Sequence, residues 1–284
     1  MSAHSYELFV EGIGFWASRM PGWDVARAVL RGEANAPTAA ASRPSPALLP
    51  PAERRRAPDT VAVSLEVATR ACESAGRDPK QLPSVFACTH GDLSISDNIC
   101  DTLAKTPTLV SPTKFHNSVH NAAAGYWTIA TGSMQPYIAL SAHGYTFGQG
   151  LLEAASQAIC ESTPVLYVAY DIEARGPVAT MQPSRGVLAG ALVLSQEKRE
   201  RNLARLILDV ETDSRAHQSL ARPTNAALVE GNAMMHALPL FEALADGVER
   251  ELVQMLAPRL ALRMHVLPAG AARQYRTELR QGTQ

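Results

Sequence analysis

A strand, a tight turn and the start of a helix follow one another between Gly132 and Ala155, in the segment GSMQPYIALSAHGYTFGQGLLEAA. Residues 137–141 (YIALS) combine aromatic and β-branched side chains, which is typical of a strand. Hydrophobic residues then recur at helical spacing from Phe147 to Ile159. The segment therefore predicts a strand–turn–helix elbow of the kind that presents a nucleophile.

The turn of this elbow lacks the residue that the geometry would serve best. A helix N-terminus has unpaired N–H groups and a positive dipole end, which lower the pKa of a thiol and stabilise an oxyanion. The turn from Ala142 to Tyr145 contains no cysteine. His143 could act there as a base, or it could face solvent or a partner. The pattern indicates a catalytic scaffold without its catalyst.

The segment before the elbow, SPTKFHNSVHNAAAG, runs from Ser111 to Gly125. It resembles the β-ketoacyl synthases of the thiolase superfamily, in which a Ser-Pro segment leads to an Asn-x-Ala-Ala-Gly helix start. Ser111-Pro112 and Asn121 with residues 123–125 match these two motifs. The resemblance implies that the elbow is the site of that family's nucleophilic cysteine.

The family's next landmarks are a Gly-x-x-Gly-Pro turn, a strand, the cysteine and Gly-Glu-Ala-Ala on the following helix. Gly132 and Pro136 match the turn. Counting without gaps forward from Pro136, or backward from Glu153, places the family's cysteine at Gly144, next to His143. The resemblance therefore implies no catalytic residue at this position.

The same order of motifs covers residues 6 to 212. It implies an α/β fold, a thiolase-like half-fold in which helices cover a mixed sheet, and a ketosynthase-like N-terminal-half domain over residues 1–212. We expect residues 206–210 to form an edge strand. We expect residues 213–284 to form an irregular segment plus an amphipathic helix over 238–256, a short helical C-terminal extension packing on the domain. The other expected elements are strands over 8–14, 85–91, 165–171 and 186–194, and a helix over 61–76.

Ketosynthases continue into a second half that supplies two histidines, and His217, His236 and His265 stand in neither of its motifs. Decarboxylative condensation requires a thiolate for the acyl chain and histidines that steer the carbanion and oxyanion. The chain thus resembles the shortened, cysteine-free ketosynthase-like proteins of aryl-polyene pigment clusters, regarded as chain-length-factor-like partners of an active ketosynthase.

This resemblance implies a noncatalytic subunit that completes the acyl tunnel of an active β-ketoacyl synthase across a heterodimer interface and works with acyl carrier protein. Two alternatives are an independent acyltransferase or thioesterase, and a homodimeric acyl-binding scaffold. The first would use Ser118 or Ser141 with His120 or His143, although no Gly-x-Ser-x-Gly elbow is present.

No charged residue occurs from Phe115 to Leu152. Polar residues interrupt this stretch, so we expect it to be buried in protein, partly at a subunit interface, rather than in a membrane. The candidate interface or tunnel residues are Phe115, His116, Asn117, Ser118, Val119, His120, Asn121 and Tyr126.

The formal net charge of −1 argues against nucleic-acid binding. The one triple run of arginines, Arg54, Arg55 and Arg56, is either a solvated helix start or a docking point for an acidic carrier protein. The N-terminus lacks the features of a signal peptide, so we expect a cytoplasmic location.

The four cysteines fit neither a zinc pattern nor a disulfide framework. Cys88, at a strand end, is either a reactive thiol or a small buried hydrophobe. His116 and His120 are four residues apart but have no evident third ligand. We therefore expect no metal and no cofactor.

Overall fold

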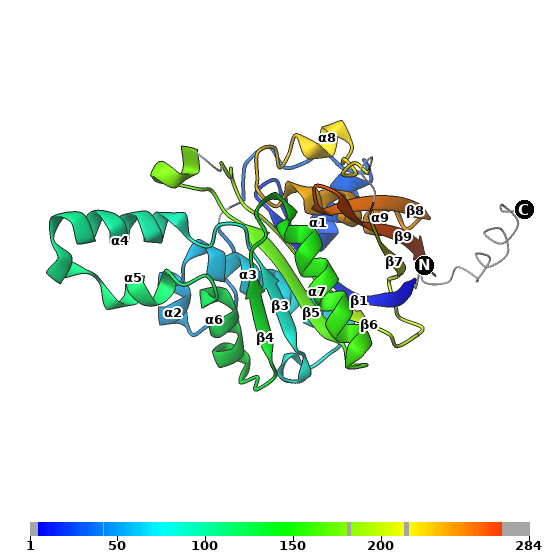
Figure 1. The fold of residues 1–284 in the computed structure, drawn as a ribbon, viewed down its shortest axis with the longest axis horizontal. Coiled ribbons are helices and arrows are strands. Elements are labelled where there is room, and N and C mark those ends of the chain that lie inside the picture. The colour runs from blue at the N-terminus through cyan, green and yellow to red at the C-terminus, as the bar shows by residue number, and fades with distance from the viewer. Residues whose placement is uncertain (1–4, 42, 181–182, 213–215, 269–284) are drawn as a thin grey trace, which may run out of the picture.

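One mixed sheet runs through the part of the chain that the computed structural model describes, residues 5–41, 43–180, 183–212 and 216–268. The strand order is β4-β3-β5-β6-β1-β7-β9-β8, and β2 pairs with β1 (Figure 1). The strands are β1 (Tyr6–Ala17), β2 (Met20–Pro21), β3 (Ser84–Ala87), β4 (Tyr137–Leu140), β5 (Val165–Asp171), β6 (Leu188–Ser195), β7 (Ala204–Thr212), β8 (Arg250–Ala257) and β9 (Leu260–Pro268).

Strands β4, β3 and β5 are parallel, and the pairs β5–β6, β6–β1, β1–β7, β7–β9 and β9–β8 are antiparallel. Every residue of β5 (VLYVAYD) and of β6 (LAGALVLS) is buried. Continuous apolar strands of this kind are typical of a sheet covered on both faces.

Helices supply that cover. They are α1 (Trp23–Leu30), α2 (Pro51–Arg56), α3 (Asp59–Ala75), α4 (Leu93–Lys105), α5 (Pro112–Asn117), α6 (Ala122–Thr131), α7 (Thr146–Cys160), α8 (Pro223–Ala226) and α9 (Leu238–Asp246). Helix α3 packs with α6 on one face, and α7 packs with α1 and α9 on the other (Figure 1). The mixed α/β class expected from the sequence is confirmed.

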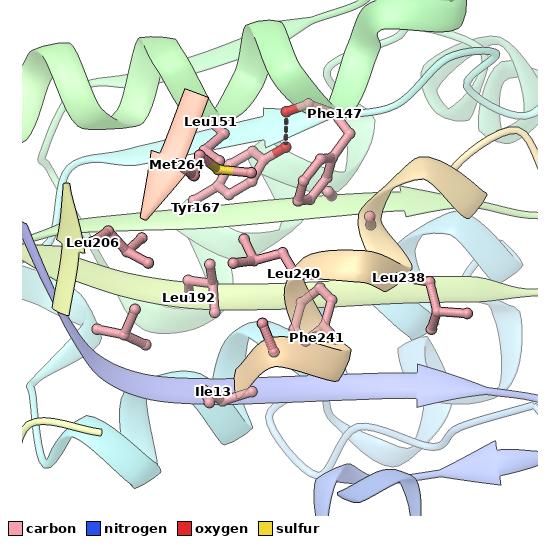
Figure 2. Close-up of a cluster of buried hydrophobic side chains, with 14 of the residues drawn as sticks. Ile13, Phe147, Leu151, Tyr167, Leu192, Leu206, Leu238, Leu240, Phe241 and Met264 are labelled. Carbon is pink, nitrogen blue, oxygen red and sulfur yellow. Dashed lines mark hydrogen bonds between the residues drawn. The ribbon is translucent and has the colours of Figure 1, made fainter. Parts of the chain in front are cut away.

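The core on the α7 face is centred on aromatic and leucine side chains. Phe147 and Leu151 of α7 lie over Tyr167 of β5, whose hydroxyl donates to the Phe147 carbonyl over 2.7 Å (Figure 2). Phe241 of α9 lies close to Gly190 of β6, where an added Cβ would come within 2.2 Å of the Phe241 ring. The helix can therefore approach the sheet only because β6 has glycine at this position.

The predicted C-terminal helix is wrong beyond Asp246. Helix α9 ends at Gly247, which has a left-handed φ of 64°, and residues 250–268 form the β8–β9 hairpin instead. Burial alternates along β8, with Leu252, Gln254 and Leu256 buried. This period of two is that of a strand, and the leucines that also fit a helical period concealed it.

The prediction that residues 206–210 form an edge strand is also wrong. They lie in β7, which pairs with β1 on one side and with β9 on the other. The hairpin after residue 212 thus extends the same sheet.

The outer edge of β8 is occupied by the segment before α8. The backbone N–H of Ser219 donates to Val253 O, and its Oγ accepts from Val253 N, both over 2.8 Å. Gln218 Oε1 accepts from Met255 N over 3.0 Å. At the opposite end of the sheet, β3 is the one described strand that pairs with β4. The β4 edge is therefore open to another strand.

Candidate functional site

The elbow expected from the sequence is present, and its strained residue is His143. Strand β4 ends at Leu140, the 3₁₀ turn η3 spans His143–Tyr145, and α7 begins at Thr146. His143 has a φ of 54°, a conformation that residues other than glycine rarely adopt and that recurs at functional turns. Thr146 Oγ1 holds the turn by donating to His143 O over 2.7 Å and accepting from Ala142 N over 3.0 Å.

His143 and Gly144 are both exposed. A Cβ added at Gly144 would meet no atom within 4 Å. In the described part of the chain, no hydrogen bond holds the His143 ring. The elbow therefore has an accessible apex, with histidine at the strained position and glycine at the position obtained by counting.

A buried polar cluster fixes the strand ends beside the elbow. Cys88 follows β3, and its thiol donates to Asp171 Oδ1 at the end of β5 over 3.2 Å. Asp171 also accepts from the backbone N–H groups of Thr89 and His90 over 3.1 and 3.2 Å. Burial raises the pKa of Asp171, and the hydrogen bonds from Thr89 and Cys88 only partly oppose that rise.

Cys88 is fully buried. Burial and the neighbouring Asp171 raise the pKa of its thiol well above the ordinary value. Because the thiolate is the reactive form, Cys88 is a structural thiol and does not replace a nucleophile at the elbow.

The serine hydroxyls of the alternative enzyme interpretation are bonded to backbone carbonyls. Ser141 Oγ donates to Thr89 O over 2.9 Å, and Ser118 Oγ donates to Phe115 O over 2.8 Å. His120 Nε2 lies 2.7 Å from Cys88 O. Within the described ranges, neither serine is hydrogen-bonded to His120 or His143, so the structure forms no Ser–His pair from these residues.

A groove of about 580 Å³ brings together three of the predicted site residues: Arg56 of α2, His116 of α5 and Tyr126 of α6. The His116 and Tyr126 rings meet edge to face, with centroids 6.0 Å apart. Arg54 instead donates from Nη2 to Leu49 O over 2.9 Å, and Arg55 is exposed outside the groove. The groove is lined by Leu48, Leu49, Pro50, Ala52, Glu53, Arg56, Thr113, His116, Tyr126, Ile129 and Ala130.

The other predicted site residues are spread along α5 and the turn before α6. Phe115 and Val119 are exposed, whereas Asn117 is buried. Asn121 Nδ2 donates to the Tyr137 hydroxyl over 3.1 Å and so links this turn to β4.

An exposed apolar surface surrounds the open edge of the sheet. Ile129 is 79% exposed, Met134 is 95% exposed and Ile138 of β4 is 38% exposed. Helices α4 and α5 project from the body as an arm, residues 93–117 (Figure 1). Helix α4 buries none of its residues, although Ile95, Ile99 and Leu103 form an apolar stripe along it. Large apolar side chains exposed at a sheet edge are candidates for an interaction site.

The described ranges contain no group of three His, Cys, Asp or Glu side chains placed to hold a metal ion. No helix there has the length and apolar character required to cross a membrane.

Residues 30–254 match the family model described as beta-ketoacyl synthase, N-terminal domain. The chain belongs to this family. The match covers the elbow, the groove and most of the β8 strand. No curated protein sequence matches this ketosynthase-family chain significantly.

Solved structures confirm the thiolase-like ketosynthase fold. The complex of the ketosynthase ApeO with its chain length factor ApeC from Xenorhabdus doucetiae aligns with a TM-score of 0.67 and 19% identity, over 91% of this chain and 98% of the other. The AntDE:AntF complex, a type II PKS acyl-carrier protein with its ketosynthase bound to the hexaketide, gives 0.70 and 10%, over 93% and 99%. The ishigamide ketosynthase/chain length factor gives 0.64 and 13%, over 91% and 98%.

Sequence reasoning missed Asp171 and the loop wall of the groove. Asp171 is the last residue of an apolar strand, and a single acidic residue at the end of a buried strand was the available signal. Leu48 and Leu49 lie in an Ala/Pro-rich stretch that carries no periodic pattern.

Proposed function

We propose that this chain is the noncatalytic, chain-length-factor-like partner of an active β-ketoacyl synthase in polyene or polyketide biosynthesis, of the aryl polyene pigment type, in the cytoplasm. The observation that carries the proposal is the elbow. Its strand, strained turn and helix have the form that presents a nucleophile, yet His143 and Gly144 stand where a thiol would be needed.

The structural neighbours support the partner role. Two of the three are complexes of a ketosynthase with a chain length factor, and the third holds a ketosynthase with its carrier protein. Each alignment covers 98–99% of the matched chain and 91–93% of this one. The fold of this protein therefore corresponds to nearly the whole of the matched chain in each assembly.

The open β4 edge and the apolar surface around it are the proposed contact with the ketosynthase. An open edge offers unpaired backbone N–H and C=O groups, and the exposed apolar residues beside it would be desolvated on association. The uncharged segment from Phe115 to Leu152 supplies most of this surface.

In the complex, the ketosynthase would supply the thiolate, the histidines and most contacts with acyl carrier protein. Residues on α5 and in the turn before α6, Phe115 and Val119 among them, would complete the wall of its acyl tunnel. Each methylene that such a wall excludes from burial loses about 0.8 kcal/mol, so a bulky side chain here can limit product length.

A homodimeric acyl-binding scaffold is the second candidate. The uncharged character of the segment favours it, because two copies of this surface would meet without repulsion between like charges.

The proposal is tested by reconstitution of condensation with the ketosynthase from the same gene cluster, charged acyl carrier and malonyl carrier. We expect product only when both proteins are present. Condensation by this chain alone would contradict the noncatalytic role, and full activity of the ketosynthase alone would contradict the partner role.

A further inference from the structure

The buried side chains of Cys88 and Asp171 tie the loop of residues 88–91, which directly follows β3, to the body of the protein. Asp171 is itself fixed from the side of the body. It is the last residue of the buried strand β5, and its backbone carbonyl accepts from Asn232 Nδ2 over 3.3 Å. Asn232 is also buried. The Asp171 carboxylate is therefore a fixed group against which the loop is held.

Three consecutive backbone N–H groups of the loop bind this pair of side chains. The Thr89 N–H donates to both Asp171 oxygens, each over 3.1 Å, and the His90 N–H donates to Oδ1 over 3.2 Å. The Gly91 N–H donates to Cys88 Sγ over 3.1 Å. Consecutive N–H groups that converge in this way form an anion-binding nest, and here they bind a carboxylate of the same chain. Removal of either side chain would leave N–H groups of the loop without a partner.

The carbonyl groups of the same loop hold two segments of the proposed ketosynthase contact. Cys88 O lies 2.7 Å from His120 Nε2, in the turn before α6, where the neighbouring Val119 is 48% exposed. Thr89 O accepts from Ser141 Oγ, directly after β4, over 2.9 Å. Because the two acceptors are on adjacent residues, displacement of the loop would release the turn and the elbow together.

Cys72 is a second buried thiol and provides a comparison. It lies on α3 and belongs to the same cluster of buried apolar residues as Cys88. Within the ranges that the structure describes, the Cys72 sulfur makes no hydrogen bond, whereas the Cys88 sulfur both donates and accepts one. The two thiols are therefore matched in burial and differ in the groups that they hold.

We propose that Cys88 and Asp171 are a positioning pair for the proposed ketosynthase contact. Through residues 88–91 they hold the turn before α6 and the end of β4 in the arrangement that meets the partner. Neither side chain touches the partner, because both are fully buried. This inference rests on the proposed function, since it assumes that a ketosynthase binds this surface.

The first measurement is hydrogen–deuterium exchange of the isolated chain. Cys88→Ala removes a donor and an acceptor, so exchange in residues 118–122 and 141–146 should rise about tenfold. Cys88→Ser keeps a donor and an acceptor at the same place, and exchange there should stay within about twofold of wild type. Cys72→Ala is the matched control, because it removes an equally buried thiol, and it should leave both segments within about twofold.

The second measurement is the affinity for the ketosynthase of the same gene cluster, by calorimetry. We expect Cys88→Ala to weaken binding about tenfold, and Cys88→Ser and Cys72→Ala to stay within about twofold of wild type. Asp171→Asn keeps the size of the side chain but replaces one acceptor oxygen by a donor, and it should also weaken binding about tenfold. This variant carries the test if Cys88→Ala does not fold.

Two outcomes would overturn the inference. One is an equal effect of Cys88→Ala and Cys72→Ala on exchange and on affinity, which would show that the Cys88 thiol only stabilises the fold. The other is a loss in Cys88→Ser as large as that in Cys88→Ala. Because exchange is measured without the ketosynthase, the expected exchange pattern together with no binding by the wild-type chain would contradict the proposed function and leave the hold of the pair on the two segments in place.

Discussion

At the scale of single residues, His143 determines what the elbow can do. Its backbone lies in the left-handed region at φ 54°, so the turn stores strain that Thr146 helps to hold. No thiol neighbours this histidine, so the elbow has no sulfur atom that could hold an acyl group. The adjacent Cys88 does not supply one, because its thiol is buried and bonded to Asp171.

Restoring a thiol at the elbow should not restore condensation. Gly144→Cys should fold, since an added Cβ has no atom within 4 Å and Gly144 is not in the left-handed region. We expect the variant to react with a thiol reagent at the elbow but to form no condensation product without a ketosynthase. His143→Cys is the companion variant, because it places the thiol at the strained residue. Product from either variant alone would contradict the noncatalytic assignment.

The elbow could be predicted from the sequence because its strand and its helix each follow from the local pattern of apolar residues. Residues 137–141 and the helical spacing after Phe147 correspond to β4 and α7. The strained position in the turn could not be predicted in this way, because an ungapped alignment with the family motifs contains no information about backbone dihedral angles. The count gave Gly144, whereas the left-handed residue is His143.

At the scale of elements, a buried carboxylate ties β1 to the end of α3 and to the loop between β6 and β7. Glu11 is 1% exposed and accepts two hydrogen bonds from Arg77, over 2.6 and 2.7 Å. Ser195 Oγ and Arg199 Nη1 donate to the same carboxylate over 2.6 and 3.2 Å. Burial would raise the pKa of Glu11, but these hydrogen bonds and the two arginine charges outweigh it and hold the pKa below its ordinary value of 4.5.

This network predicts a specific loss of stability in acid. Since the folded state holds the pKa of Glu11 below the unfolded value, the contribution is complete above about pH 4.5 and is lost as the pH falls through the folded pKa. Glu11→Gln should lower the free energy of unfolding at pH 7 by about 2 kcal/mol, because the arginines lose their charged partner. The difference from wild type, measured by urea unfolding, should shrink below pH 4.5; a constant difference from pH 7 to pH 3.5 would contradict it.

Strands buried on both faces can be predicted from the sequence, whereas elements selected by long-range contacts cannot. The buried strands β5 and β6 appear in the sequence as continuous apolar runs, which are informative over seven or eight residues. Residues 250–256 carry leucines that fit both a helix and a strand, and the pairing of β9 with β7 that selects the strand is a long-range contact. The groove could not be predicted either, since its walls come from α2, α5, α6 and an irregular loop.

At the scale of the whole molecule, the two edges of the sheet are unlike. The β8 edge is capped by Gln218 and Ser219, whereas no strand of the described ranges covers the outer edge of β4, which lies beside exposed apolar side chains. A sheet with one capped and one open edge can add a strand at only one end, which favours a closed two-chain assembly over a filament.

This asymmetry leads to a prediction about the interface. Ile138→Lys places a charge on the open edge, where Ile138 is 38% exposed and the change should be tolerated by the isolated chain. An unpaired charge buried on association costs about 3 kcal/mol, or roughly a hundredfold in Kd for the ketosynthase. Val248→Lys is the matched control, because Val248 is exposed in the turn before β8, and it should leave affinity unchanged.

The partner role is tested by native mass spectrometry of this chain co-expressed with the ketosynthase of its gene cluster, with only one of the two tagged. We expect a stable one-to-one complex that Ile138→Lys weakens about a hundredfold and that Val248→Lys preserves. Purification of this chain alone, as a stable homodimer beside a ketosynthase that is fully active without it, would contradict the partner role.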